Sequence, residues 1–346
     1  MEQKIAVLTL TKGSYELGKK IKHHLNDTSV DLYGLEKNIE NESESYKEQQ
    51  FKLGFKELFE TYDALICIMA TGIVVRHLAP LIQDKRYDPA VVVMDEKGQF
   101  AISLLSGHIG GGNELTEKLA QVMNAQAVIT TATDVQNVTA IDVMAKKING
   151  WYGDFKKTTK HINYLLATHK KVGLYDEDNR VTDLRGLEKI TQLTSEVTNS
   201  FEAVIVVSTK LFDTLPSNCY QVVPKEFILG MGAKRDTPLS TISEEFKVFS
   251  QMHQIHERSI KQIVSIDLKK NEKGIIEFSQ ELEVPFDTYT KEELEPSSLK
   301  YPQSEFVKSI VGIGNVAVSS ADYATGGNVL TERYGHNGVT FALGKE

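Results

Sequence analysis

One glycine-rich stretch, residues 106–114 with the sequence SGHIGGGNE, carries the side chains with the clearest chemical potential. It holds one imidazole, His108, one amide, Asn113, and one carboxylate, Glu114, so that acid/base chemistry and ligand binding are both open to it. The stretch stands between a predicted buried strand and a predicted helix. Bare backbone N–H groups at such a turn favour an anion or an oxygen that gains negative charge.

The same stretch has a plain structural alternative. Asn113 can cap the following helix, Glu114 can answer the helix dipole, and the glycines can form an ordinary flexible turn. Three consecutive glycines also suit a backbone that approaches a ligand closely. In the functional interpretation the catalytic candidates are His108, Asn113 and Glu114, and the substrate-binding candidates of this stretch are Ser106, Gly107, Gly110, Gly111 and Gly112.

Two further turns follow predicted strands, at residues 70–80 and 130–134. Ligands sit at the carboxyl ends of the strands in doubly wound sheets, so we expect both turns to share a crevice with residues 106–114. The first could instead be a solvated helix face, and the second a polar turn that caps the next helix. The binding candidates in these two turns are Thr71, Gly72, Arg76, Thr131 and Asp134.

A fourth turn is predicted at residues 230–238, after a short strand at 227–229. Two glycines and two cations ahead of a helix suit an anionic side chain, which backbone N–H groups and positive charge would hold together. Solvated loop cations are an equally common explanation. The candidates are Gly230, Gly232, Lys234 and Arg235.

Composition narrows the class of protein. The net charge is −8 and no basic block is dense enough to follow a phosphate backbone, so nucleic acid is not an expected partner. No apolar run reaches the length of a membrane span and the first residues show no signal-peptide pattern, so we expect a cytoplasmic protein without a membrane partner. Cys67 and Cys219 are expected to be core thiols, and no side-chain spacing predicts a metal site.

Apolar strands alternate with helical stretches along the whole sequence. A chain of 346 residues is longer than one typical domain. We predict an α/β protein with Rossmann-like N-terminal and C-terminal lobes joined by a smaller α/β middle domain. The predicted domains are residues 1–135, 136–224 and 225–346.

Taken in order, the motifs resemble the CbiG family of cobalamin biosynthesis. The resemblance rests on ATG with Arg76, on SGHIGGGN at 106–113, and on residues 131–134. It recurs in GMGAKRDT at 230–237, SIDLK at 265–269 and GIGNV at 312–316. The chain departs from the family pattern at Val318, where an acidic residue is common, and at Glu332, where a lysine-containing strand is expected.

The resemblance implies a hydrolase of the anaerobic, cobalt-early route. It would open the δ-lactone of cobalt-precorrin-5A and release acetaldehyde to give cobalt-precorrin-5B. We hypothesise that His108 is the general base, that the N–H groups of residues 110–112 with Asn113 hold the oxyanion, and that Glu114 orients His108 or moves the proton. Arg76, Lys234 and Arg235 are the candidates to clamp the substrate's carboxylates.

Cofactors and partners follow from the same resemblance. The protein would need no cofactor of its own, because cobalt arrives with the tetrapyrrole substrate. A homodimer and transient contacts with neighbouring pathway enzymes stay open. Two rivals also stay open: a non-catalytic tetrapyrrole carrier or scaffold, and a nucleotide-binding module, although neither dinucleotide nor P-loop glycine motifs are present.

Overall fold

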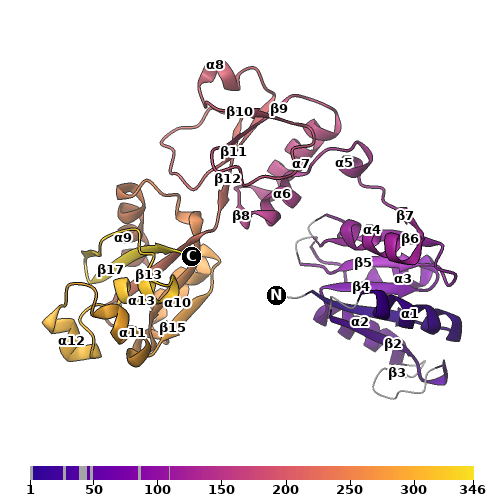
Figure 1. The fold of residues 1–346 in the computed structure, drawn as a ribbon, viewed down its shortest axis with the longest axis horizontal. Helices are drawn as coiled ribbons and strands as arrows, with labels where there is room; N and C mark the ends of the chain where they lie inside the picture. Colours follow the sequence, from indigo (N-terminus) through magenta and orange to yellow (C-terminus); the bar gives the residue numbers. More distant parts are fainter. Residues whose placement is uncertain (1–2, 26–28, 39–44, 47–49, 85–86, 109) are drawn as a thin grey trace. The chain divides into compact units, whose positions relative to one another are not determined.

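A computed structural model describes residues 3–25, 29–38, 45–46, 50–84, 87–108 and 110–346, so that Ile109 of the central turn lies outside the described residues. Contacts divide the chain into two compact units, Met1–Val143 and Met144–Glu346 (Figure 1). The first contains a seven-stranded sheet and the second contains two five-stranded sheets. The predicted α/β class is confirmed, and each sheet combines parallel and antiparallel strands.

The first sheet has the strand order β3-β2-β1-β4-β5-β6-β7. Continuous apolar runs form its central strands, which are buried because helices cover both faces. Its strands are β1 Lys4–Thr9, β2 Ser29–Leu35, β3 Ser45–Tyr46, β4 Ala64–Ile68, β5 Ala90–Met94, β6 Phe100–Leu105 and β7 Gln126–Val128.

Two pairs of helices cover this sheet. On one face, α1 Lys12–His24 and α4 Gly112–Met123 bury apolar stripes that include Ile21 and Leu119. On the other face, α2 Phe51–Thr61 and α3 Thr71–Leu78 bury Phe55 and Val74. In each case residues three or four positions apart meet the sheet, which is the spacing expected for an amphipathic helix.

The direction of β6 decides where the loops of the first unit lie. β5 is parallel to β4, but β6 runs antiparallel to β5, with Val91 opposite Leu105, and β7 is parallel to β6. We use the word edge for the border of the sheet formed by the ends of its strands. The carboxyl ends of β6 and β7 lie at one such border, which we call the His108 edge. The carboxyl ends of β1, β4 and β5 lie at the opposite border, which we call the Thr71 edge. The prediction that the turns at Thr71 and Gly107 share a crevice is therefore wrong.

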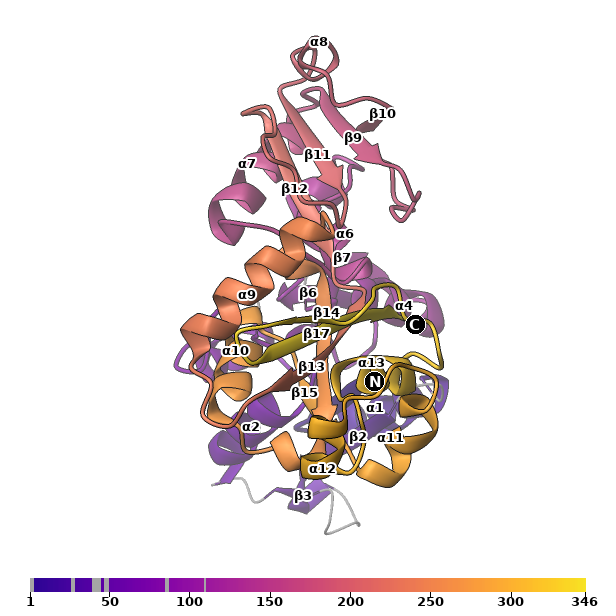
Figure 2. The same ribbon diagram turned by 90° about the vertical axis from the view of Figure 1, so that its left-hand side faces the viewer.

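The second unit contains two further sheets, with orders β10-β9-β11-β12-β8 and β15-β14-β13-β17-β16. Figure 2 shows β13, β14 and β17 side by side in the second of these. The remaining elements are α5 Ala132–Val135, α6 Ile141–Lys147, β8 Gly150–Trp151, α7 Phe155–Ala167, β9 Val172–Asp176, β10 Leu187–Ile190, α8 Ser195–Thr198, β11 Ala203–Val207, β12 Cys219–Pro224, β13 Phe227–Ala233, α9 Leu239–Met252, β14 Ile260–Ile266, α10 Lys273–Leu282, β15 Phe286–Tyr289, α11 Lys291–Ser298, α12 Glu305–Val311, α13 Ala317–Ala324, β16 Tyr334–His336 and β17 Val339–Lys345.

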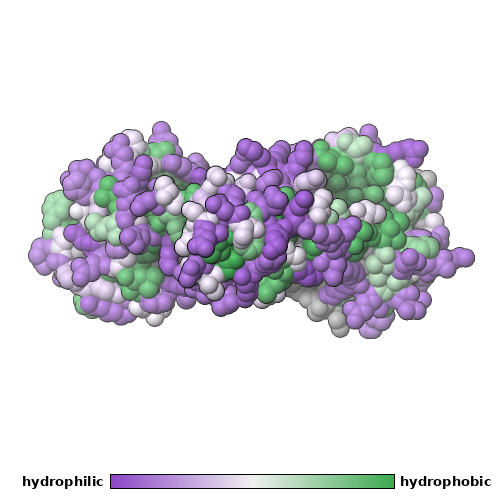
Figure 3. All heavy atoms as spheres, turned by 90° about the horizontal axis from the view of Figure 1, so that it is seen from above, coloured by the Kyte–Doolittle hydropathy of each residue, from purple (hydrophilic) through white to green (hydrophobic). Residues whose placement is uncertain are grey.

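The domain prediction and the compact units divide the chain differently. The predicted boundaries, 135/136 and 224/225, fall between the three sheets, whereas the compact units meet between Val143 and Met144. The three-domain division therefore stays a prediction. Among the described residues, no helix combines the length and the apolar character that crossing a bilayer requires. On the face drawn in Figure 3, apolar side chains gather over the first unit, whereas hydrophilic side chains cover most of the rest.

Candidate active site

His108 lies at the His108 edge, where three side chains surround its imidazole. Nε2 lies 3.0 Å from Asp134 Oδ2 and 2.9 Å from Thr133 Oγ1. Nδ1 lies 3.8 Å from Asp142 Oδ1, which is an ion-pair distance and longer than a hydrogen bond. An ionised Asp134 can only accept a hydrogen bond, so its contact with Nε2 requires that Nε2 carries the proton and donates it. The histidine thus stands between two carboxylates.

These groups come from loops that the sheet brings together. His108 follows β6, and Thr133 and Asp134 belong to α5, which follows the neighbouring parallel strand β7. Asp142 lies in the first turn of α6, after a buried segment that includes Ala140 and Ile141. The sequence prediction joined the turns after β6 and β7 correctly, and the hydrogen bond that Asp134 Oδ2 accepts from His108 shows that they meet.

Asn113 connects the same loops. Its Nδ2 donates hydrogen bonds to Thr131 Oγ1 at 3.1 Å and to Asp134 Oδ2 at 2.8 Å, and its Oδ1 accepts one from Ser103 Oγ at 2.6 Å. The side chain is buried, so leaving these groups unpaired would be costly. The alternative in which Asn113 caps α4 is wrong, because the N-cap is Gly111. Asn113 instead positions Asp134 against His108.

The backbone of the turn bonds to itself. The N–H of Gly111 donates to His108 O at 3.0 Å, that of Gly112 to Ser106 O at 3.1 Å, and that of Asn113 to Gly107 O at 2.9 Å. These donors are therefore not available to an oxyanion, and the prediction that residues 110–112 form an oxyanion hole is wrong for Gly111 and Gly112. Of these three glycines, only Gly110 has an N–H that donates no hydrogen bond to a described residue.

The glycines have a packing role that the sequence did not reveal. A Cβ on Gly110 would lie 2.4 Å from Ser106 Cβ, and one on Gly107 would lie 2.6 Å from Asn113 Oδ1. Gly111 has φ 83° and Ser106 has φ 52°, in the left-handed region that a serine rarely adopts. The turn is compact because glycines let its two ends meet, and this holds His108 in place.

Charge and burial act in opposite directions on His108. Burial lowers its pKa, but the nearby carboxylates of Asp142 and then Asp134 raise it, and the net effect is a pKa above the ordinary value of 6.5. The imidazolium form therefore persists to a higher pH than in an ordinary histidine. Such a histidine serves as a proton donor as well as an acceptor.

The role proposed for Glu114 fits the geometry poorly. Glu114 is exposed in the first turn of α4, where its charge meets the positive end of the helix dipole. The carboxylates beside His108 are Asp134 and Asp142. Sequence reasoning missed Asp142. A lone carboxylate in the apolar segment 138–145 was the available signal, because an ionisable side chain is rarely buried without a partner.

Thr71, Gly72 and Arg76 lie at the opposite edge of the sheet. Arg76 is exposed, and its Nη1 donates to Gly72 O of its own helix at 3.0 Å. Thr71 lines a crevice of about 400 Å³ at the carboxyl ends of β1 and β4, where the strand order reverses. This switch crevice is lined by Leu10, Thr11, Ile68, Met69, Ala70, Thr71, Ile73, Val93, Asp95, Glu96, Phe100 and Ile102. None of these lining residues is a cation.

The C-terminal candidates do not form the predicted glycine cradle. Gly230 and Gly232 are buried within β13, and a Cβ on Gly230 would lie 1.9 Å from the backbone O of Ala317 in α13. The prediction of a turn at these glycines is wrong, because they allow a helix to pack closely on the strand. Lys234 and Arg235 are exposed in the turn after β13 and stay candidates to bind carboxylates.

Among the described residues, no group of three His, Cys, Asp or Glu side chains is arranged to hold a metal ion. Cys67 is a buried thiol, as predicted, whereas Cys219 is only partly buried, so the prediction that Cys219 is a core thiol is wrong. Burial raises the pKa of Cys67 to about 12, so this thiol is unreactive near neutral pH.

The fold and the site define an α/β protein with a histidine held between two carboxylates at the edge of its first sheet. Three protein-family models match the sequence. The cobalamin synthesis G N-terminal family matches residues 54–134, the cobalamin biosynthesis central region matches residues 139–224, and the cobalamin synthesis G C-terminus matches residues 227–344. A cobalt-precorrin-5A hydrolase from Salmonella typhimurium is 37% identical over 99% of this chain and 97% of its own length. The chain belongs to the CbiG family, as its motifs indicated.

Other proteins are also similar over most of the chain. A cobalt-precorrin-5A hydrolase from Priestia megaterium is 29% identical over 94% of this chain and 90% of its own length. The crystal structure of a cobalamin biosynthesis protein G homolog from Sulfolobus solfataricus covers 99% of this chain and 97% of that one, at 18% identity and a TM-score of 0.43.

Proposed function

We propose that this chain is a cobalt-precorrin-5A hydrolase, which opens the δ-lactone of its substrate and releases acetaldehyde to give cobalt-precorrin-5B. The observation that carries this proposal is the 37% identity to the Salmonella typhimurium enzyme across 99% of the chain. The His108 edge supports it, because lactone hydrolysis needs a group that removes a proton from water and a group that donates one to the leaving oxygen.

The three titratable groups at this edge differ in their access to solvent. The exposed fraction of the side chain falls from 33% for Asp134 to 16% for His108 and 2% for Asp142. Asp134 and His108 therefore face the reacting molecules as one acid/base pair. Asp142 lies behind them and holds the imidazole through Nδ1, as a positioning residue.

Lactone opening can be written with this pair. Water attacks the carbonyl carbon as its proton passes to Asp134. The bond between that carbon and the ring oxygen then breaks, and the leaving oxygen takes the proton of His108. Transfer of a proton from Asp134 to His108 restores the pair. The products are a carboxyl group and an alcohol, so the step consumes one water and no other reactant.

Release of acetaldehyde follows from the alcohol. Its O–H proton passes to the acid/base pair as the carbon–oxygen double bond forms and the carbon–carbon bond breaks. The electron pair of that bond moves into the macrocycle, which then takes up the proton. Cobalt belongs to the substrate in this proposal, and the protein's share is proton management.

Partners and location stay proposals on weaker support. The tetrapyrrole is the proposed partner, and no nucleic-acid or membrane partner is proposed. The cytoplasmic location expected from the sequence stays a prediction, as do a homodimer and contacts with neighbouring enzymes.

The test is acetaldehyde release when the purified full-length protein meets cobalt-precorrin-5A without oxygen. We expect acetaldehyde in proportion to the substrate consumed, with cobalt-precorrin-5B as the macrocyclic product. A carrier would bind the substrate and return it unchanged. Tight binding without acetaldehyde would therefore overturn the hydrolase and favour the carrier.

A further inference from the structure

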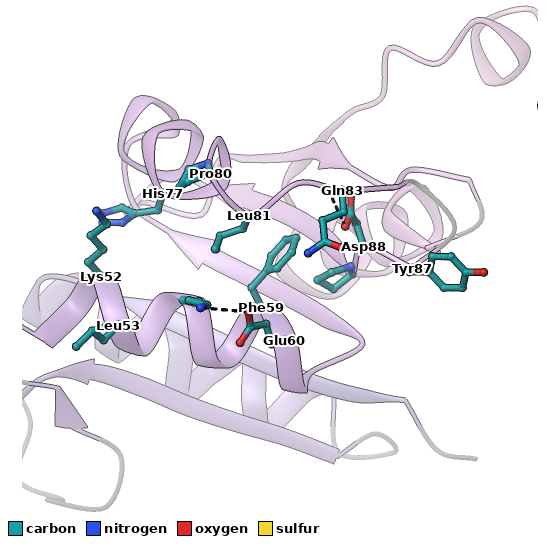
Figure 4. A pocket seen from close by; sticks show the side chains of 12 residues that line it. Lys52, Leu53, Phe59, Glu60, His77, Pro80, Leu81, Gln83, Tyr87 and Asp88 are labelled. Atoms are coloured by element: carbon teal, nitrogen blue, oxygen red, sulfur yellow. Dashed lines mark hydrogen bonds and ion pairs between the residues drawn. The ribbon is translucent and has the colours of Figure 1, made fainter.

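A second cavity of the first unit lies beside α2, and we call it the α2 groove. It encloses about 510 Å³ between one side of α2 and residues 77–83 and 87–89 (Figure 4). From Lys52 to Glu60 it follows nine residues of α2, a rise of about 12 Å. Its lining residues are Lys52, Leu53, Lys56, Phe59, Glu60, His77, Pro80, Leu81, Gln83, Tyr87, Asp88 and Pro89.

One end of the groove is basic. Lys52 and His77 lie next to each other there (Figure 4). Burial, and then the charge of Lys52, lower the pKa of His77, so its imidazole is neutral near pH 7. The ring is held against Phe51 and Phe55, with centroid distances of 5.1 and 5.3 Å. This end therefore offers one ammonium group and one neutral imidazole in a fixed position.

The two carboxylates in the groove are already engaged. Both oxygens of Asp88 accept hydrogen bonds from the N–H of Gln83, at 3.2 and 3.1 Å. Glu60 pairs with Lys56 at 3.6 Å. Among the described residues, Lys52 has no carboxylate partner. Its charge is therefore available to an anionic group that enters the groove.

The rest of the lining is largely apolar. Phe59 and Pro89 are buried at its floor, and Leu81 is half-buried. Leu53 and Tyr87 stand at the rim with 70% and 79% of their surfaces exposed. Exposed apolar side chains around a hollow are typical of a binding site. A flat apolar ring could pack against the rim, while a carboxylate side chain of the same ligand pairs with Lys52.

The groove reaches the edge of the sheet at which the acid/base pair lies. Its far end is formed by Asp88 and Pro89, directly before β5. Val91 of β5 is opposite Leu105, and His108 follows Leu105 by three residues. The segments before β5 and after β6 therefore lie at the same edge, so one extended ligand can meet both.

We propose that the α2 groove is a substrate subsite, in which a pyrrole ring of the macrocycle packs on the apolar lining and Lys52 binds a carboxylate of one of its side chains. The subsite rests on the proposed function, since it assigns one part of that substrate. It differs from the switch crevice, whose lining includes no cation that could bind a carboxylate.

The test uses three variants of the full-length protein. Lys52→Gln removes the charge, Lys52→Arg keeps it, and Lys19→Gln removes an exposed charge from α1 on the other face of the sheet. Anaerobic titration with cobalt-precorrin-5A, followed by absorbance, gives Kd, and acetaldehyde release gives KM and kcat. For Lys52→Gln we expect Kd and KM to rise roughly tenfold with kcat within about twofold. Both controls should match wild type.

Each other outcome has a definite meaning. Unchanged Kd and KM in Lys52→Gln would overturn the subsite, and so would an equal loss in Lys19→Gln, which would indicate general attraction between charges. If wild type binds the tetrapyrrole without releasing acetaldehyde, the hydrolase proposal fails. A selective loss of binding in Lys52→Gln would then still support the subsite.

Discussion

The two edges of the first sheet differ in what their loops present. At the His108 edge, a compact turn and α5 hold a hydrogen-bonded set of polar side chains that includes Asn113 and Asp134. At the Thr71 edge, apolar side chains and two acids form a crevice of about 400 Å³. The reversal of one strand, β6, therefore separates the loop that carries His108 from the place where a doubly wound sheet usually binds its ligand.

Among substitutions that leave the His108 side chain in place, the largest effect is expected from a pair of glycine substitutions. Gly110→Ala places a Cβ 2.4 Å from Ser106 Cβ, so the turn must shift and His108 with it. Gly72→Ala meets only the end of the flexible Arg76 side chain, at 3.3 Å. We expect Gly110→Ala to lower kcat for acetaldehyde release about a hundredfold and Gly72→Ala to leave it within about twofold. Equal effects would remove the distinction between the edges.

Asp142→Asn tests the part of the site that lies deepest. Loss of this charge removes the first of the groups that raise the pKa of His108, so the activity that needs imidazolium should fall off at a lower pH than in wild type. We expect kcat to decrease roughly ten- to a hundredfold, as when a functional histidine loses its orienting partner. A pH–rate profile gives both quantities. A lower kcat with an unshifted profile would mean that Asp142 is merely structural.

A smaller change is expected from each residue of the Thr71 edge. Thr71→Val keeps the shape of the side chain and removes its hydroxyl. Arg76→Gln removes a charged group that donates a hydrogen bond to the backbone of its own helix. We expect kcat and KM to stay within about threefold of wild type in both variants. A tenfold rise in KM for Arg76→Gln would restore the clamp that the sequence predicted and would bring the Thr71 edge back into the substrate site.

The smallest effect concerns stability against pH. The folded state raises the pKa of His108 above 6.5, so its ion pairs contribute fully below that pH, and the contribution is lost as pH rises through the raised value. The His108→Gln substitution should therefore decrease the free energy of unfolding more at pH 5.5 than at pH 9. Urea unfolding at both values measures it. A loss that is independent of pH would contradict the ion-paired histidine.

Much of the first sheet, and the contact between His108 and Asp134, could be predicted from the sequence. Strands such as Ala64–Ile68 and Phe100–Leu105 are visible as apolar runs, and the meeting of His108 with Asp134 followed from two neighbouring strand ends. The antiparallel pairing of β5 and β6 places Gly107 and Thr71 at opposite edges. The error arose because a rule for parallel strands was applied across an antiparallel pair.

Other features depend on tertiary contacts that no local pattern encodes. Gly230 resembles a glycine of a binding turn in sequence, but it is buried in β13 because α13 packs against it from about 90 residues later in the chain. Asp142 shows no motif, and it gains its role only when α6 brings it within 3.8 Å of His108. The N–H groups of Gly111 and Gly112, which were predicted to hold an oxyanion, are used inside the turn, and only the three-dimensional structure reveals this.

The measurement that tests the central claim most directly is acetaldehyde release by His108→Gln beside Thr71→Val, each with bound cobalt-precorrin-5A. We expect His108→Gln to bind the substrate normally and to lose between about a hundredfold and ten-thousandfold in kcat, while Thr71→Val turns over as wild type does. Near-normal turnover by a folded His108→Gln variant, or an equal loss in Thr71→Val, would contradict the assignment of the chemistry to the His108 edge.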